Sequence, residues 1–293
     1  MSFLTHMAKI RNWICQETNQ TFWIISFLIF CFLFFTGSIR AESDQNTVES
    51  VDGLIRSVYK DTQHVLTAPL SWKQNDMILF SILSLSTFEL MLMDRDTQRA
   101  IQRNRTTYTD RISNWTSHYT NRSANLTIGG FYLCGLVFND RKCKETAFLC
   151  LESLVLSQGI TISLKHIVGR TRPFGDKGAF HFDPLKFPPP SYSQSFPSGH
   201  ATIAFAVSSV IAEQYKSWMV KSLAYGSAAL VAWGRVNNNV HFVSDVFWSG
   251  VIGISVGRCL VKFHRKDDSI SNCELISTAD AGGFKLGVLI RLK

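Results

Sequence analysis

Residues 195–206, SFPSGHATIAFA, place a Pro-Ser-Gly-His turn directly before an apolar run. Ser198 is a residue type favoured at helix N-caps, and the run after it predicts a buried helix. Backbone N–H groups at a helix start attract anions, and Gly199 lets a ligand approach the backbone closely. Two interpretations are open at this point: a plain helix cap, or an anion site with His200 as a proton donor beside it.

Outside this stretch, apolar blocks of helix length recur along the chain, and several carry Gly, Ser or Ala at helical spacing, which favours close helix packing. Few reach 18 uninterrupted apolar residues, so the helices are expected to be buried mostly against each other. The pattern predicts an all-α bundle of about six core helices. The blocks are residues 77–93, 128–138, 146–164, 201–215, 222–234 and 246–263.

The N-terminal region, residues 1–41, has the features of an export segment. Lys9 and Arg11 precede an apolar stretch from Phe22 to Phe35, which suits a signal peptide better than a full membrane span. Cleavage after Ala41 and retention as an N-terminal anchor are both open. Either outcome predicts a membrane-associated or periplasmic (extracytoplasmic) protein.

The remaining chain divides by composition into a polar segment with an amphipathic helix (42–76), the bundle (77–263) and a C-terminal tail (264–293), in which a short strand is one alternative. The net charge of +8 and mean hydropathy of +0.07 suit contact with anionic lipid or phosphate. No Lys/Arg run indicates a nucleic-acid partner. No CxxC pair or Cys/His cluster indicates a zinc site, and disulfide pairing stays open.

Two further clusters follow apolar blocks. Lys165 and Arg172 are seven residues apart, which predicts that both project from one face at a helix end, with Pro173 turning the chain away. After Arg235 and an Asn turn, His241 and Asp245 are spaced i,i+4, so the carboxylate is expected to orient the ring. Each cluster alone is equally explained by solvated charges or helix-dipole contacts.

Taken together, the three clusters supply cations, a helix-start anion site and two histidines, one with a carboxylate. Phosphoryl transfer needs mainly such positioning and charge stabilisation. KHIVGRTRP, FPSGH and RVNNNVHFVSD resemble the three motifs of the type 2 phosphatidic acid phosphatase superfamily. This superfamily includes lipid phosphate and isoprenyl diphosphate phosphatases, with glucose-6-phosphatase and vanadium haloperoxidases as relatives. The motifs span about residues 160–250, and the helical pattern extends the likeness to 77–263.

The resemblance implies a role for each matching residue. His241 would be the nucleophile that forms a phosphohistidine, Asp245 would hold its ring, and His200 would protonate the leaving alcohol and then activate water. No metal or other cofactor is implied. The implied phosphate ligands are Lys165, Arg172, Ser198, Gly199 and Arg235.

Two positions complicate this likeness. Gly234 stands where the family motif usually begins with Ser, so a hydroxyl contact is expected to be lost. Arg170 lies close to Arg172 and is a further candidate for a phosphate contact.

The implied function is a metal-independent phosphatase that acts on a lipid phosphate monoester or isoprenyl diphosphate at a membrane surface. The alternatives are an exported acid phosphatase of broad specificity, a vanadate-dependent haloperoxidase, and a bundle that only binds a phosphorylated lipid. The two histidines and Asp245 argue against the last, because binding alone would need only the basic groups.

Overall fold

The structure is a computed structural model that describes residues 45–186, 190–266, 273–280 and 283–290. The predicted export segment, residues 1–41, lies outside the described residues. The chain forms two compact units, residues 57–271 and residues 1–56 together with 272–293.

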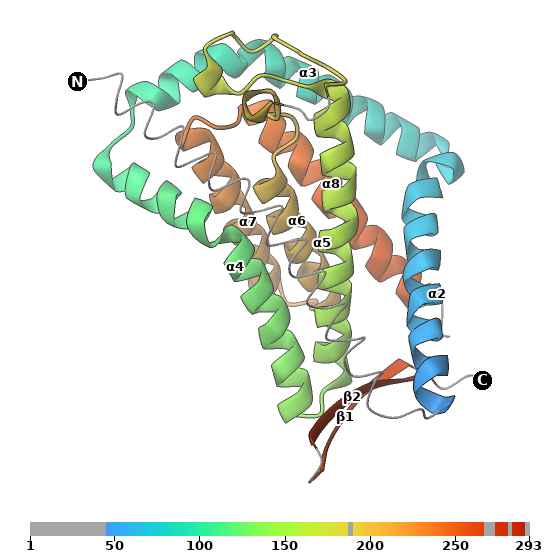
Figure 1. The fold of residues 1–293 in the computed structure, drawn as a ribbon. Coiled ribbons are helices and arrows are strands. Elements are labelled where there is room, and N and C mark those ends of the chain that lie inside the picture. Colours follow the sequence, from blue (N-terminus) through green and yellow to red (C-terminus); the bar gives the residue numbers. More distant parts are fainter. Residues whose placement is uncertain (1–44, 187–189, 267–272, 281–282, 291–293) are drawn as a thin grey trace. The chain divides into compact units, whose positions relative to one another are not determined.

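Residues 57–271 contain the predicted helical bundle, which is confirmed (Figure 1). A further helix, α2 (Gln45–Thr67), precedes it and overlaps the polar segment 42–76. Residues 94–127, the polar stretch between the first two apolar blocks, form the end of α3 and the first part of α4. The bundle helices are α3 (Gln74–Arg103), α4 (Thr107–Val137), α5 (Arg141–Val168), α6 (Gly199–Gln214), α7 (Trp218–Asn237) and α8 (Val243–Lys266).

The C-terminal segment forms an antiparallel strand pair, β1 (Cys273–Asp280) and β2 (Gly283–Ile290). Its register pairs Cys273 with Ile290 and Asp280 with Gly283. The predicted tail therefore contains strands, and the all-α description holds for residues 57–271.

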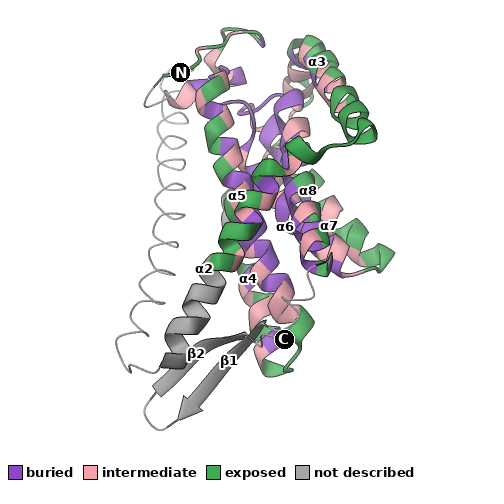
Figure 2. Ribbon diagram, turned by 90° about the vertical axis from the view of Figure 1, so that its right-hand side faces the viewer, coloured by how far each residue is buried: buried purple, intermediate pink, exposed green. Residues whose placement is uncertain are grey.

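The core of the bundle lies where α5, α6 and α8 pack together, as the buried segments in Figure 2 show. Leu149, Val210 and Leu260, one from each of these helices, are fully buried. Within the part of the chain that the structure describes, three helices are long and apolar enough to cross a membrane: Gln74–Arg103, Arg141–Val168 and Val243–Arg265. The apolar stretch of α3 is almost entirely exposed, which suits contact with lipid.

The end of α5 corrects the predicted placement of Arg172. The helix stops at Val168 because Gly169 adopts a left-handed conformation (φ 59°), where a Cβ would overlap the Asp183 carbonyl. Arg172 therefore lies in the following loop, with extended backbone, and does not share a helix face with Lys165. Its N–H donates to the Tyr192 carbonyl oxygen (2.7 Å), which ties the loop together.

Candidate active site

His241 lies in the short connection between α7 and α8 and is 1% exposed. Its Nδ1 lies 2.7 Å from the carbonyl oxygen of Ser195. Because a carbonyl oxygen only accepts, Nδ1 carries the proton and donates, which leaves the Nε2 lone pair available in the neutral ring. Nε2 has no hydrogen-bond partner among the described residues. The ring is therefore held in the tautomer that a nitrogen nucleophile requires.

Asp245 is held rigidly beside His241 in the first turn of α8. Its Oδ2 accepts from the Ser195 hydroxyl (2.6 Å) and from the Phe242 N–H (2.8 Å). The same oxygen lies 3.8 Å from His241 Nδ1, too far for a direct hydrogen bond. Ser195 thus connects the two residues: its hydroxyl binds the carboxylate and its carbonyl binds the ring. Ser195 was absent from the predicted site, although it begins the stretch that contains FPSGH.

Arg170 is fully buried, and its guanidinium is engaged by other groups of the protein. Its guanidinium forms ion pairs with Asp245 Oδ1 (2.6 Å) and Asp94 Oδ2 (2.8 Å). It also donates to the Ala179 carbonyl and the Ser244 hydroxyl, so all three nitrogens are occupied. The suggestion of a phosphate contact at Arg170 is therefore wrong, because the two carboxylates occupy this cation.

Asp94 links α3 to the start of α8. It accepts from the Ser244 backbone N–H (3.1 Å) and from the Ser244 hydroxyl. Further along α3, the Gln98 side chain donates to Asn239 Oδ1 (2.8 Å). No motif in the sequence pointed to Asp94; a lone acidic residue that ends an apolar block was the available signal. The second half of α3 therefore positions the connection that carries His241.

The start of α6 lies at the turn for which the sequence predicted an anion site, and Ser198 differs from an ordinary helix cap. Ser198 is the N-cap residue, but its side chain makes no capping hydrogen bond, and its Oγ has no partner among the described residues. Its N–H donates to Ser249 Oγ (2.7 Å), which in turn donates to the Asp245 carbonyl (2.6 Å). The hydroxyl of Ser198 is thus available for a ligand, while the backbone is fixed to α8.

Lys165 reaches this turn from α5. A Cβ built on Gly199 would lie 3.8 Å from Lys165 Nζ, so the ammonium is adjacent to the start of α6. Gln158, also on α5, donates to the Gly199 carbonyl (2.8 Å) and holds the two helices together. His200 follows in the first turn of α6 and is buried. The structure therefore places Lys165, Ser198, Gly199 and His200 around one helix terminus.

Arg172 and Arg235 are almost fully buried, and both act electrostatically on His241. Burial lowers the pKa of His241 to about 3. The two guanidinium groups lower this pKa further, and Asp245 acts in the opposite direction. The ring is consequently neutral near pH 7.

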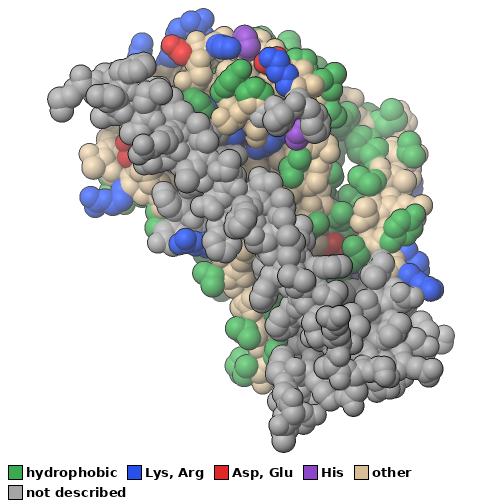
Figure 3. Space-filling view, viewed as in Figure 1, with side chains coloured by type: hydrophobic (Ala, Val, Ile, Leu, Met, Phe, Trp, Pro, Cys, Tyr) green, Lys and Arg blue, Asp and Glu red, His purple; other side chains and the backbone are tan. Residues whose placement is uncertain are grey.

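Figure 3 shows Lys, Arg and His side chains at the end of the bundle where the loop after α5 lies.

The structure also accounts for Gly234. A Cβ at this position would overlap Thr116 Oγ1 of α4, which is buried against α7. A serine at 234 therefore does not fit beside Thr116, and glycine allows the close approach of the two helices.

A pocket of ≈ 210 Å³ opens beside the site, between α3 and the loop after α5. Pro173 and Phe242, the neighbours of Arg172 and His241 in the chain, form part of its wall. Its lining residues are Arg95, Gln98, Arg99, Gln102, Pro173, Asp176, Gly178 and Phe242. Two of these are arginines, so the pocket presents positive charge.

Residues 146–268 match the model of the PAP2 superfamily. Among solved structures, LpxE from Aquifex aeolicus is similar at 25% identity over 58% of this chain and 95% of its own, with a TM-score of 0.45. A transmembrane PAP2-type phosphatidylglycerolphosphate phosphatase from Bacillus subtilis is similar at 21% identity, over 64% of this chain and 96% of its own, with a TM-score of 0.48. No curated protein matches the sequence.

Proposed function

We propose that the chain hydrolyses a lipid phosphate monoester or an isoprenyl diphosphate through a phosphohistidine, because residues 146–268 match the model of the PAP2 superfamily. The observation that carries this proposal is His241: a buried, neutral imidazole, held through Nδ1 to Ser195, whose Nε2 is unengaged among the described residues.

In the first step, His241 Nε2 attacks phosphorus and the bond from phosphorus to the leaving oxygen breaks. His200 gives its proton to that oxygen, which leaves as the alcohol of a monoester or as the isoprenyl monophosphate of a diphosphate. In the second step, His200 takes a proton from water, the water oxygen attacks phosphorus, and the N–P bond breaks to release phosphate. Asp245 is a positioning residue that acts through Ser195 and stabilises the positive charge on the ring.

The phosphate oxygens are bound by buried cations and by the start of α6. Lys165 lies next to Gly199, while Arg172 and Arg235 exert their charge at His241. The unengaged hydroxyl of Ser198 and the N–H groups at the helix start complete the cradle. These preorganised charges stabilise the transferring phosphoryl group without reorganisation.

The substrate is proposed to be a lipid because three helices are apolar enough to lie in a membrane, and α3, which borders the pocket, exposes its apolar stretch. The pocket with Arg95 and Arg99 receives the anionic part of the substrate beyond the scissile phosphate. A broad-specificity phosphatase is the second candidate function, since none of the described contacts selects a particular lipid tail.

Alkaline quench in detergent of the full-length protein turning over ³²P-labelled substrate tests the mechanism. We expect an acid-labile, base-stable phosphoryl label on His241 in the wild type and none in His241→Gln. Label on another residue, or turnover without any label, would contradict the proposal. A panel of phosphatidate, an isoprenyl diphosphate and a water-soluble phosphomonoester then separates the two candidate functions: equal kcat/KM for all three favours broad specificity.

A further inference from the structure

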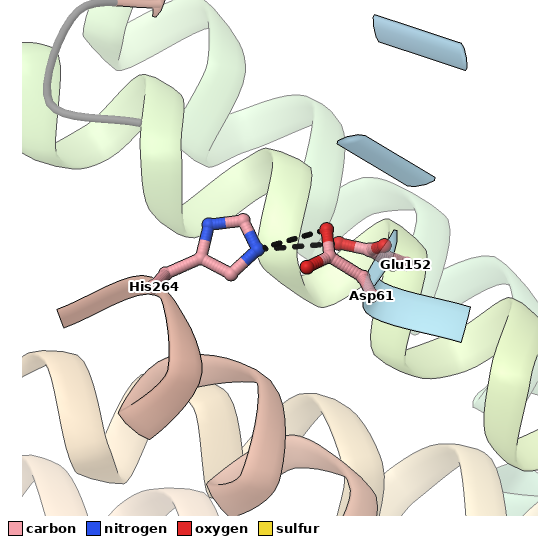
Figure 4. A group of neighbouring side chains, drawn as sticks. All are labelled: Asp61, Glu152 and His264. Carbon is pink, nitrogen blue, oxygen red and sulfur yellow. Dashed lines mark hydrogen bonds and ion pairs between the residues drawn. The ribbon is translucent and has the colours of Figure 1, made fainter. Parts of the chain in front are cut away.

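A second group of buried titratable residues lies away from the phosphate site. Asp61 of α2, Glu152 of α5 and His264 of α8 each offer a ligand atom, and these atoms lie within 4.8 Å of one another (Figure 4). Glu152 is 13 residues from Lys165 along α5, or about 20 Å. His264 is 19 residues from Asp245 along α8, or about 28 Å. The group is therefore separate from the active site.

This group brings two carboxyl groups and one imidazole together. His264 Nε2 contacts Asp61 Oδ2 at 3.0 Å and Glu152 Oε2 at 3.9 Å. Among the described residues, no Lys or Arg pairs with either carboxylate, and the imidazole is the only cationic group available to both. Two buried carboxyl groups this close to each other are costly to ionise together, so one of them carries a proton unless a cation joins the group.

Glu152 points into the group without a hydrogen bond. It is 5% exposed, and neither of its carboxylate oxygens has a hydrogen-bond partner among the described residues. Asp61 Oδ1 likewise has none. Figure 4 shows both carboxylates turned toward the same ring nitrogen, each from a different helix. Unused acceptor oxygens and an imidazole nitrogen that converge in this way form a ligand set for a cation.

We propose that Asp61, Glu152 and His264 bind a divalent ion of the Zn²⁺ class that fastens α2 to α5 and α8. Ligand atoms around a tetrahedral Zn²⁺ lie about 3.3 Å apart, and the 3.0 and 3.9 Å contacts bracket that spacing. One imidazole and two carboxylates suit Zn²⁺ better than Mg²⁺ or Ca²⁺, which take oxygen ligands. Water supplies the remaining position. The two charges of the ion neutralise both carboxylates.

The stacking of His64 on Phe263 (ring centroids 4.1 Å apart) brings α2 to the end of α8 beside this group. This contact places Asp61, one helical turn from His64, within reach of His264. A bound ion would therefore add a strong link where α2 meets the bundle.

The test is zinc content and zinc-dependent stability of the full-length protein, purified in detergent from zinc-supplemented cells and dialysed against metal-free buffer. We expect about one Zn²⁺ per wild-type chain by mass spectrometry, and a Tm that falls with EDTA and recovers with Zn²⁺ but not Mg²⁺. Glu152→Gln is expected to lower zinc affinity at least 10-fold and to abolish the Tm response. Glu213→Gln, which alters an exposed ion pair on α6, is the matched control and is expected to behave as wild type.

Wild-type protein that retains no zinc and shows no Tm response overturns the proposal, as does Glu152→Gln that binds zinc as well as Glu213→Gln. If Glu152→Gln does not fold, the absorption spectrum of Co²⁺-loaded wild type decides: bands of a tetrahedral N/O site support the proposal, and their absence contradicts it. Phosphohistidine trapping at His241 is measured separately, so a failure of the zinc site and a failure of the proposed function are distinguishable.

Discussion

The two buried charge clusters of this protein differ in how their carboxylates are balanced. At the active site, Arg170 forms ion pairs with both Asp94 and Asp245, and serine hydroxyls and backbone N–H groups occupy the remaining oxygens. At the second cluster, Asp61 and Glu152 share one imidazole. Every carboxylate oxygen of the first cluster is hydrogen-bonded within the chain, whereas Asp61 Oδ1 and both oxygens of Glu152 have no hydrogen-bond partner among the described residues. Burial alone thus does not distinguish a positioning network from a binding site; the number of satisfied oxygens does.

The strongest test of the active-site cluster is His241→Ala. Removal of the nucleophile is expected to lower kcat by about 10⁴-fold or more, as loss of a nucleophile does in other covalent enzymes. The measurement is phosphate release from phosphatidate, with the thermal unfolding midpoint as the check on folding. Retention of more than a tenth of wild-type turnover would contradict the assignment of His241.

Loss of the balancing cation is expected to produce the largest effect on stability. Arg170→Met leaves two buried carboxylates without their guanidinium and is expected to cost about 3 to 5 kcal/mol of unfolding free energy. Denaturant unfolding in detergent measures it. Arg258→Met is the control, because Arg258 pairs with Glu213 at the surface and such pairs contribute less than about 1 kcal/mol. Equal losses of unfolding free energy in Arg170→Met and Arg258→Met would contradict the role of Arg170 as the cation that balances the active-site carboxylates.

The pH dependence of stability tests the burial of neutral His241. Its folded pKa of about 3 lies below the unfolded value of about 6.5, so the unfolded state binds more protons between these values. The contribution of His241 to stability is therefore fully present above pH 6.5 and is lost as pH falls toward 3. At pH 4.5 the wild type is expected to have lost roughly 2 to 3 kcal/mol more than His241→Gln. If the unfolding free energies of the wild type and His241→Gln change in parallel with pH, the burial of a neutral His241 is contradicted.

The smallest expected effect is an unchanged or increased unfolding free energy, where the preceding predictions expect a loss. In EDTA, Glu152→Gln removes an unbalanced buried carboxylate and is expected to be as stable as the wild type or more stable by about 1 kcal/mol. Comparison of unfolding free energies in EDTA measures this directly. A loss as large as that of Arg170→Met would mean that Glu152 is already balanced within the chain.

The helical bundle and the phosphate-binding motifs were predictable because both depend on local sequence patterns. Apolar blocks of helix length predicted α3 to α8, and the motifs located Lys165, Ser198, His241 and their partners. The ion pairs of Arg170 were not predictable, because its partners Asp94 and Asp245 lie 76 and 75 residues away in the sequence. Ser195 was missed for a related reason: its role depends on a backbone carbonyl, which every residue has.

The sequence by itself therefore determined which segments become helices and which residue types are available to bind and transfer a phosphate, since periodicity and motif spacing are properties of neighbouring residues. The tertiary structure alone decided that Arg172 lies near His241, at the proposed phosphate site, and that Arg170 pairs with Asp94 and Asp245. It also brought Asp61, Glu152 and His264, on three separate helices, into one buried group. The physical reason is that the balance of a buried charge depends on partners distant in the chain, and only the packed helices determine those partners.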